Sequence, residues 1–327
     1  MQGLPRIQGL LNALKMGHCA PSVMRTLQDL QGIESERVLK ATAGLPGGIG
    51  WLGAECGCVT SAVMMMGLTY GEDILIDGNG QNPGIIPMGQ NYLNRFRPSY
   101  GGLKCSEIAR IDYKDKKDVK KHTLGASSRC FKAICGSPVL LMDTMEKYPM
   151  GILSSVDSEQ IGAYDKLLEL YRTQKFHCSQ SVLHELDEFT EGDENILRAS
   201  WGFLGGTLLQ GMTCGALTGG VLAIGLKFGD IEDSYRRVIR WTLQALIDGD
   251  IKREDLNKFN RAINISWSLT RWFEWEFGST RCRDLTRTDF NAPEGVDTYI
   301  SQNKLEHCRD IADKTAKKVR EIILRHQ

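Results

Sequence analysis

Apolar residues recur at helical spacing along the chain, and several cysteines occupy apolar positions of that pattern. In two runs, apolar residues follow a cysteine after 4, 8 and 11 positions, which places them on one face of a helix. A third run near the C-terminus has the same character. The pattern predicts an all-α protein whose helices turn cysteines inward. The runs are Cys19, Val23, Leu27 and Leu30; Cys178, Val182, Leu186 and Phe189; and Cys308, Ile311, Ala312, Ala316, Val319 and Ile323.

Residues 201–226 form an uncharged stretch, which raises the question of a membrane span. The stretch is long enough to cross a bilayer, but it contains eight glycines. Gly211, Gly215 and Gly219 recur every four residues, a spacing that lets another helix approach closely. We therefore expect a buried, tightly packed helix here and no membrane-spanning segment.

The two halves of the chain are copies of each other. Their first cysteines, Cys19 and Cys178, are 159 residues apart, and the glycine-rich segments 43–71 and 200–229 match at an offset of 158. Beyond these segments the offset rises to 177 and then 178. A repeat of this length indicates a duplicated structural module. We expect two homologous helical bundles in tandem.

The repeat also sets the expected domain boundaries. The first copy covers residues 1–137, a linker covers 138–159, and the second copy covers 160–327. The second copy is longer by about nineteen residues between its glycine-rich segment and its third cysteine. There we predict a helix that begins at Asp233 or Ser234 and ends at Gly249, whereas Gly, Pro and Asn in residues 78–91 of the first copy predict a loop. This divergence suggests different roles for the copies.

Composition narrows the classes of partner and compartment. The chain has 327 residues, with 40 basic and 40 acidic residues, so no overall charge attracts nucleic acid or anionic lipid. The first thirty residues lack the layout of a signal peptide, and ten cysteines are too few for a small disulfide scaffold of this length. We expect a cytoplasmic protein with reduced or metal-bound thiols. Without a C-x-x-C-H motif, covalent c-type haem is not expected.

Four cysteines of each copy occupy equivalent positions. Packing alone would accept Ala, Ser or Val at such positions, so the match at all four favours a chemical role. Four thiolates in a dry pocket are the usual ligands of an iron–sulfur cluster, and they can come from scattered positions. We therefore predict metal ligation in both copies. The matched residues are Cys19, Cys56, Cys105 and Cys130 in the first copy, and Cys178, Cys214, Cys282 and Cys308 in the second.

The first copy has two further cysteines. Cys58 and Cys135 stand where the second copy has Ala216 and Asp313. Six thiols exceed the need of a simple four-thiolate cluster. We expect the first copy to hold a larger or open-sided cluster, with Cys58 and Cys135 as additional ligands or catalytic candidates, and the second copy to hold an electron-relay cluster.

The order of these cysteines resembles a known family. A first cysteine, the segment GMTCGALTGGVLAIG, the segment FGSTRC and a last cysteine in a C-terminal helix are similar to the redox-active C_GCAxxG_C_C proteins. The resemblance covers nearly all of residues 176–325 and, more loosely, residues 17–136. It implies a small helical domain with four redox-active cysteines, related to the helical iron–sulfur part of split-Soret cytochromes. Electron transfer or reductive catalysis is the expected function.

Other interpretations of the cysteines stay open on sequence alone. Cys56-Gly57-Cys58 and Cys130 with Cys135 could form exchanging pairs of a thiol–disulfide oxidoreductase. Four cysteines per copy could also hold structural zinc in a binding module, or they could be unligated buried thiols. His18 and His177 precede the first cysteines as possible metal ligands, although an ordinary hydrogen bond is the more common role.

A basic segment near the first copy's cysteines suggests a partner. Residues 104–132 contain nine basic and four acidic residues. A net positive surface could attract an acidic ferredoxin or flavodoxin, although such a run is more often a solvated loop. A homo-oligomer is also compatible with the sequence. No acid–base pair, phosphate loop or nucleotide motif identifies a substrate.

Overall fold

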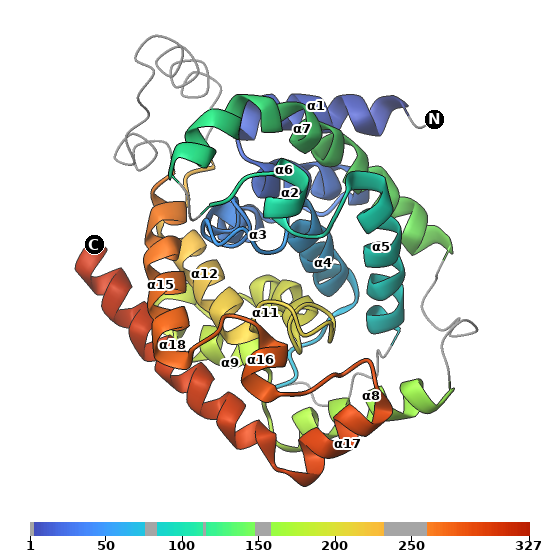
Figure 1. Cartoon of the computed structure of the whole chain (residues 1–327), viewed down its shortest axis with the longest axis vertical. Coiled ribbons are helices and arrows are strands. Elements are labelled where there is room, and N and C mark those ends of the chain that lie inside the picture. Colours follow the sequence, from blue (N-terminus) through green and yellow to red (C-terminus); the bar gives the residue numbers. More distant parts are fainter. Residues whose placement is uncertain (1–2, 76–83, 114–115, 148–157, 232–259) are drawn as a thin grey trace. The chain divides into compact units, whose positions relative to one another are not determined.

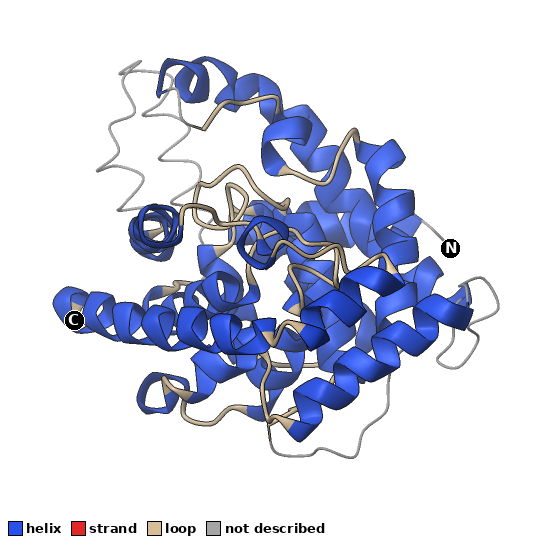
Figure 2. Cartoon of the chain, turned by 60° about the horizontal axis from the view of Figure 1, so that its bottom comes forward, coloured by secondary structure: helices blue, strands red, loops and turns tan. Residues whose placement is uncertain are grey.

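The chain folds into helices joined by loops, as Figure 2 shows. The computed structural model describes residues 3–75, 84–113, 116–147, 158–231 and 260–327, and only the backbone of residues 116–127. Within these ranges no β-strand is present, and two isolated bridges are the sole β-type pairs. The all-α prediction is confirmed.

The first copy begins with three helices that precede its glycine-rich segment and ends with a long one (Figure 1). Pro98 lies within α5 and Pro138 within α7. The elements are α1 (Gly3–Met16), α2 (Cys19–Gln31), α3 (Glu36–Ala41), the 3₁₀ turn η1 (Thr42–Gly44), α4 (Gly57–Tyr70), α5 (Ile85–Tyr100), α6 (Cys105–Ala109) and α7 (Lys116–Lys147).

The second copy repeats the main helices of this order. Helices that begin at or directly after a cysteine in the first copy have counterparts that do so in the second. In its last helix, Ile311, Ala316 and Val319 are buried on the face that follows Cys308, as the periodicity predicts. The elements are α8 (Ser158–Thr173), α9 (Cys178–His184), α10 (Asp187–Thr190), α11 (Glu194–Ser200), η2 (Trp201–Phe203), α12 (Gly215–Phe228), α15 (Arg261–Phe277), α16 (Cys282–Thr286), α17 (Pro293–Ser301) and α18 (Lys304–His326).

Chain contacts divide the molecule into two compact units that each contain parts of both copies. The first unit comprises residues 1–62, 92–143 and 224–268, and the second comprises 63–91, 144–223 and 269–327. Thus α4 and α12 each begin in one unit and end in the other. All six cysteines of the first copy belong to the first unit, and all four of the second copy belong to the second unit. Each candidate site therefore lies within one unit.

Glycines in α4 and α12 permit close helix contacts inside each unit. In the second unit, a Cβ on Gly67 would lie 2.6 Å from the carbonyl oxygen of Arg198. In the first unit, a Cβ on Gly225 would overlap with the carbonyl oxygen of Ala41. Backbones approach this closely only where no side chain intervenes. The glycine-rich segments thus form buried packing surfaces, as predicted.

Several element boundaries differ from those expected. The loop predicted over 78–91 gives way at Ile85 to α5, because Ile85 and Ile86 are buried and Pro87 is tolerated in a first helical turn. Residues 138–147 of the expected linker continue α7, where Leu141 and Met145 are buried one turn apart. Residues 78–83 and the helix predicted over 233–249 lie outside the described residues.

The helical face predicted from Cys178 to Phe189 is interrupted. α9 ends at His184 and α10 begins at Asp187, so the run forms two short helices. At the break, the carbonyl oxygen of Leu183 accepts from the Leu186 amide and from the Thr190 hydroxyl, both at 3.2 Å. Leu186 remains fully buried between them.

No helix in the described ranges is long and apolar enough to cross a membrane. The uncharged stretch 201–226 instead folds as η2, a loop and part of α12. Leu217, Val221 and Leu222 of α12 are fully buried within the protein.

Candidate functional site

Helix N-termini position three of the four matched cysteines in each copy. In the second copy, Cys178 and Cys282 are the first residues of α9 and α16, and Cys214 immediately precedes α12. Backbone amides of Gly205 and Ser179 donate hydrogen bonds to the Cys178 sulfur. Free amides and the positive end of the helix dipole stabilise negative charge at these positions. These donors partly offset the cost of negative charge on the buried sulfurs.

A short antiparallel bridge fixes the second cysteine relative to the third. In the first copy Glu55 pairs with Lys104, and the amides of Cys56 and Cys105 donate to Leu103 and Ala54 at 2.8 and 2.6 Å. The second copy repeats both bonds at the same lengths. There, Thr213 pairs with Arg281, Cys214 bonds to Thr280, and Cys282 bonds to Met212. These residues are far apart in the sequence, so the bridge is a tertiary feature.

A left-handed turn precedes the second cysteine of each copy. Residues 47–51 all have positive φ, and so do residues 205–209. Non-glycine residues in this conformation cost about 1–2 kcal/mol each. Burial of Ile49 in the first copy and of Leu208 in the second offsets this cost. Backbone hydrogen bonds between residues six apart close the turn; for example, the Gly53 amide donates to the Gly47 carbonyl oxygen at 2.9 Å. The turn so places the cysteine against the bridge.

Glycines leave room for the cysteine sulfurs. A Cβ on Gly57 would lie 2.5 Å from the Cys19 sulfur, and a Cβ on Gly215 would overlap with the Cys178 sulfur. Any side chain at these positions would displace the thiol. The equivalent contacts in the two copies show that the glycines of the repeat shape the cysteine sites.

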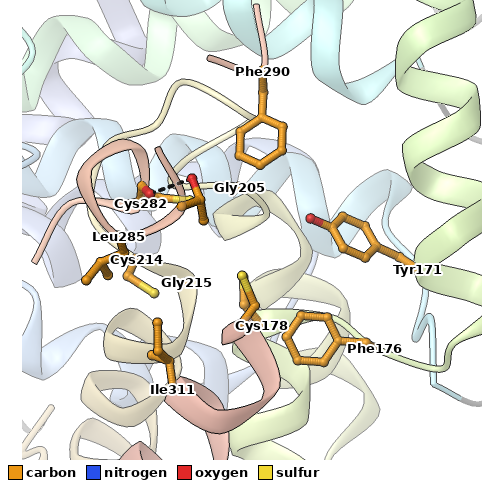
Figure 3. Close-up of a pocket in the computed structure, with 12 residues that line it drawn as sticks. Tyr171, Phe176, Cys178, Gly205, Cys214, Gly215, Cys282, Leu285, Phe290 and Ile311 are labelled. Carbon is orange, nitrogen blue, oxygen red and sulfur yellow. Dashed lines mark hydrogen bonds between the residues drawn. The ribbon is translucent and has the colours of Figure 1, made fainter. Parts of the chain in front are cut away.

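The four cysteines of the second copy line one pocket. Figure 3 shows Cys178 between the rings of Tyr171 and Phe176 on one side and Cys214 and Cys282 on the other. None of the lining residues is Asp, Glu, Lys, Arg or His. The pocket thus combines four thiols with an apolar, largely aromatic wall. Its other lining residues are Gly205, Gly215, Leu285, Thr286, Phe290, Cys308 and Ile311.

Burial and mutual repulsion hold these thiols neutral in the absence of a cation. Burial, with a further contribution from Cys308, raises the pKa of Cys178 to about 12. Burial also raises the pKa of Cys282 well above its ordinary value, and Cys214 adds to that rise. A thiol that binds a metal loses its proton, because the cation reverses this balance. Four thiols that raise one another's pKa in an apolar pocket therefore suit a positively charged metal centre.

The first copy brings five of its six cysteines together. The pKa of Cys105 is raised by burial and by Cys56, Cys19 and Cys130, which places these four thiols in one electrostatic group. Cys58 belongs to the same group, because its hydrogen bond to Cys56 lowers the pKa of Cys56. The four matched cysteines thus lie together as they do in the second copy, with Cys58 beside them.

Cys135 lies apart from this group. It is on α7, where its Cα would be 3.1 Å from a Cβ on Gly9 of α1. Burial raises the pKa of Cys135, and Arg6 counteracts the rise. Its electrostatic neighbours are therefore Arg6 and Tyr100, whose own pKa it helps to raise. Cys135 therefore does not belong to the electrostatic group of the other five thiols, although Cys58 and Cys135 both raise the pKa of Tyr100.

The histidines that precede the first cysteines stand at the N-cap positions of helices, and the side chain of His177 makes a capping hydrogen bond. His177 is fully buried; its Nε2 lies 3.1 Å from the carbonyl oxygen of Trp201, and its Nδ1 accepts from the amide of Gln180. Burial lowers the pKa of His177 to about 4, so the ring is neutral at pH 7. His18 occupies the equivalent N-cap position of α2. His177 thus has the hydrogen-bonding role rather than the ligand role.

Tyrosines next to the cysteines were not identified from the sequence. The Tyr113 hydroxyl lies 2.9 Å from the Cys105 sulfur, and Tyr299 donates to the Cys308 sulfur at 3.3 Å. A hydroxyl that donates to a thiolate stabilises its negative charge. One sequence signal was available: Tyr113 follows the third cysteine by eight residues, and Phe290 holds the same position in the second copy.

Among the described side chains, no three His, Cys, Asp or Glu residues are grouped closely enough to bind one metal ion. A single tetrahedral zinc needs its sulfurs about 2.3 Å from a common point. The thiolates of an iron–sulfur cluster bind different iron atoms, so they stand further apart.

Comparison with known proteins adds one finding. The family model described as "Putative redox-active protein (C_GCAxxG_C_C)" matches residues 17–142 and again residues 176–322. No curated protein and no solved structure matches the chain. The two matched regions contain the two cysteine groups, which agrees with a tandem duplication.

Proposed function

Because the chain belongs to the C_GCAxxG_C_C family of redox-active proteins, we propose that each copy binds an iron–sulfur cluster and that the protein works in electron transfer or reductive catalysis. The observation that carries the proposal is the pocket of the second copy, where four cysteines from distant segments line one apolar space. The ligands would be Cys178, Cys214, Cys282 and Cys308 in the second copy, and Cys19, Cys56, Cys105 and Cys130 in the first.

The residues present fit such a cluster. Each group offers two buried and two partly buried thiols, helix N-termini that direct amides at sulfur, and a tyrosine hydroxyl beside one sulfur. The thiolates of an iron–sulfur cluster bind different iron atoms, so four cysteines that line one pocket suit such a cluster. A bound cluster would supply one-electron transfer. The protein would exclude water from it and set its potential through hydrogen bonds to the sulfurs.

An acidic electron-transfer protein such as a ferredoxin or flavodoxin would be a suitable partner for the first copy. Lys104 is exposed next to Cys105, at the start of the basic segment 104–132. Arg129 has a structural task instead, since its guanidinium donates to the carbonyl oxygens of Ile108 and Ala109. The side chains of residues 114–127 lie outside the described residues.

Metal analysis tests the proposed function directly. We expect protein expressed with ample iron and purified without oxygen to contain iron and acid-labile sulfide in similar amounts and to absorb visible light. Colourless protein without iron would contradict the proposal. Zinc in place of iron would favour the structural-zinc alternative.

A second candidate function rests on the Cys56-Gly57-Cys58 pair. Of the ten cysteines, Cys56 is the one whose pKa is lowered, and the hydrogen bond from Cys58 is the largest cause. A thiol with a lowered pKa is the better nucleophile for disulfide exchange near neutral pH. Titration of free thiols before and after mild oxidation tests this candidate, because exchange at this pair would remove two thiols per chain without loss of iron.

Replacing Tyr113 or Tyr299 by Phe is expected to lower a reduction potential. Each hydroxyl donates to a sulfur that would carry more negative charge in the reduced cluster, so its loss destabilises the reduced state. We expect shifts on the order of tens of millivolts, measured by redox titration. Tyr164→Phe is the matched control, because that buried hydroxyl bonds to Gln90 and to no sulfur. An equal shift in all three variants would show a general packing effect.

A further inference from the structure

The surroundings of the first copy's cysteines are more polar than those of the second copy's cysteines. At five positions that match between the copies, the first copy carries a hydroxyl or thiol, and at four of them the second copy carries an apolar residue. Four of the pairs lie in equivalent helices and the fifth lies in the loop after the equivalent helices α6 and α16, so the comparison is between the same places in the fold. The pairs, first copy then second, are Cys58 and Ala216, Tyr92 and Leu269, Tyr100 and Phe277, Tyr113 and Phe290, and Ser137 and Thr315.

The second copy shows how this region folds without unpaired polar groups. Leu269 and Thr315 both lie within 3.5 Å of the Cβ position of Gly220, so α15 and α18 meet α12 there. Leu269 is fully buried and apolar. The Thr315 hydroxyl donates to the carbonyl oxygen of Ile311 at 2.6 Å and is satisfied within its own helix.

The first copy has buried hydroxyls at these same positions. Tyr92 and Ser137 are both fully buried, and their two hydroxyls lie beside each other with no hydrogen-bond partner outside this pair. Cys58, which is 1% exposed, is close enough to Tyr92 to raise the pKa of the phenol. Two hydroxyls that have only each other leave one buried donor unused, which destabilises a protein, and the second copy shows that the fold does not need them. They therefore point to a ligand.

We propose that Tyr92, Ser137 and Cys58 form a subsite for a small neutral molecule with a hydrogen-bond-accepting oxygen, such as a carbonyl, amide or sulfoxide compound. The subsite rests on the proposed function, because it would hold a substrate beside Cys56 of the first copy's cluster. Both hydroxyls can donate to one acceptor oxygen.

The neighbouring charges favour a neutral molecule. The groups that act electrostatically on Tyr92 are Cys58, Cys56, Tyr100 and Ser137, with no cation among them. Thiolates and a thiolate-bound cluster carry negative charge and would repel an anion. Tyr100 connects the subsite with the surface: it is partly exposed, and its hydroxyl contacts Gly136 on α7 next to Ser137.

The test uses dimethyl sulfoxide as the probe and dimethyl sulfide, which lacks the oxygen, as its matched control. Saturation-transfer NMR on the full chain reports binding whether or not a cluster is present. We expect saturable transfer to the sulfoxide and little to the sulfide. In the variant Tyr92→Leu with Ser137→Thr, built from the second copy's residues, we expect binding weakened by about tenfold or more.

Every result of this experiment either supports or overturns the proposed subsite. Equal binding to the variant, or equal transfer to both probes, would overturn the proposal. Absence of saturable binding to the native chain would also overturn it and leave an ordered water as the occupant. If the double variant fails to fold, Tyr92→Phe and Ser137→Ala remove one hydroxyl each, and either should weaken binding several-fold. Iron and sulfide analysis of the same samples separates this result from failure of the cluster proposal.

Discussion

Gly215→Ala is expected to destroy the second copy's cysteine site. The added Cβ would overlap with the Cys178 sulfur and lie 2.7 Å from the carbonyl oxygen of Phe203. Neither group can move freely, because Cys178 begins α9 and the carbonyl belongs to the buried residue that ends η2. Overpacking of this kind costs about 1–3 kcal/mol of unfolding free energy. The displaced thiol should also lower the iron content of the second copy.

Gly162→Ala provides the matched control for this prediction. Gly162 lies in α8, and a Cβ there would meet nothing within 4 Å. Alanine at such a position should stabilise the protein by about 0.5–1 kcal/mol through helix propensity. Urea unfolding of both variants measures the difference. If Gly215→Ala unfolds at the same urea concentration as the native protein and retains its iron, the proposed shape of the site is wrong.

Cys214→Ala is expected to remove one cluster and leave the other. Cys214 lines the pocket together with the other three cysteines of the second copy, and all four lie in the second compact unit. The first copy's cysteines lie in the first unit and keep their full set of thiols. Iron and acid-labile sulfide per chain should fall to roughly half the native values if the clusters are of similar size.

Cys135→Ala is the control, because Cys135 lies apart from the first copy's other cysteines. Its replacement should leave iron, sulfide and the visible spectrum unchanged. A loss of iron equal to that in Cys214→Ala would show that Cys135 is a ligand after all. Full iron content in Cys214→Ala would contradict ligation by the second copy's cysteines.

The cysteine groups show which features of the site can be predicted from the sequence and which cannot. The matched cysteines can be identified from the repeat, because equivalent residues keep equivalent places in a duplicated fold. The different surroundings of Cys135 and Cys58 could not be predicted, since those of Cys135 depend on how α7 packs against α1. The same holds for Tyr113 and Tyr299, whose hydroxyls reach sulfur only because the chain turns back between each tyrosine and its cysteine.

In the glycine-rich segments, too, the sequence predicts the close packing but not the backbone conformation. Their composition predicts close packing, which the contacts of Gly67 and Gly225 confirm. The left-handed turns over 47–51 and 205–209 oppose the local preferences of their non-glycine residues. Hydrogen bonds across six residues and burial of the side chains stabilise these turns, and neither is visible in a short window of sequence.

The sequence by itself determined the helical class, the duplication and the four cysteines that each copy shares, because hydrophobic periodicity and repeat spacing are local properties of the chain. Only the tertiary structure decided which thiols lie together, how the ends of α4 and α12 are shared between the compact units, and which hydroxyls of the first copy are buried with only each other as partners. These features depend on contacts between residues far apart in the chain, and no short-range pattern records such contacts.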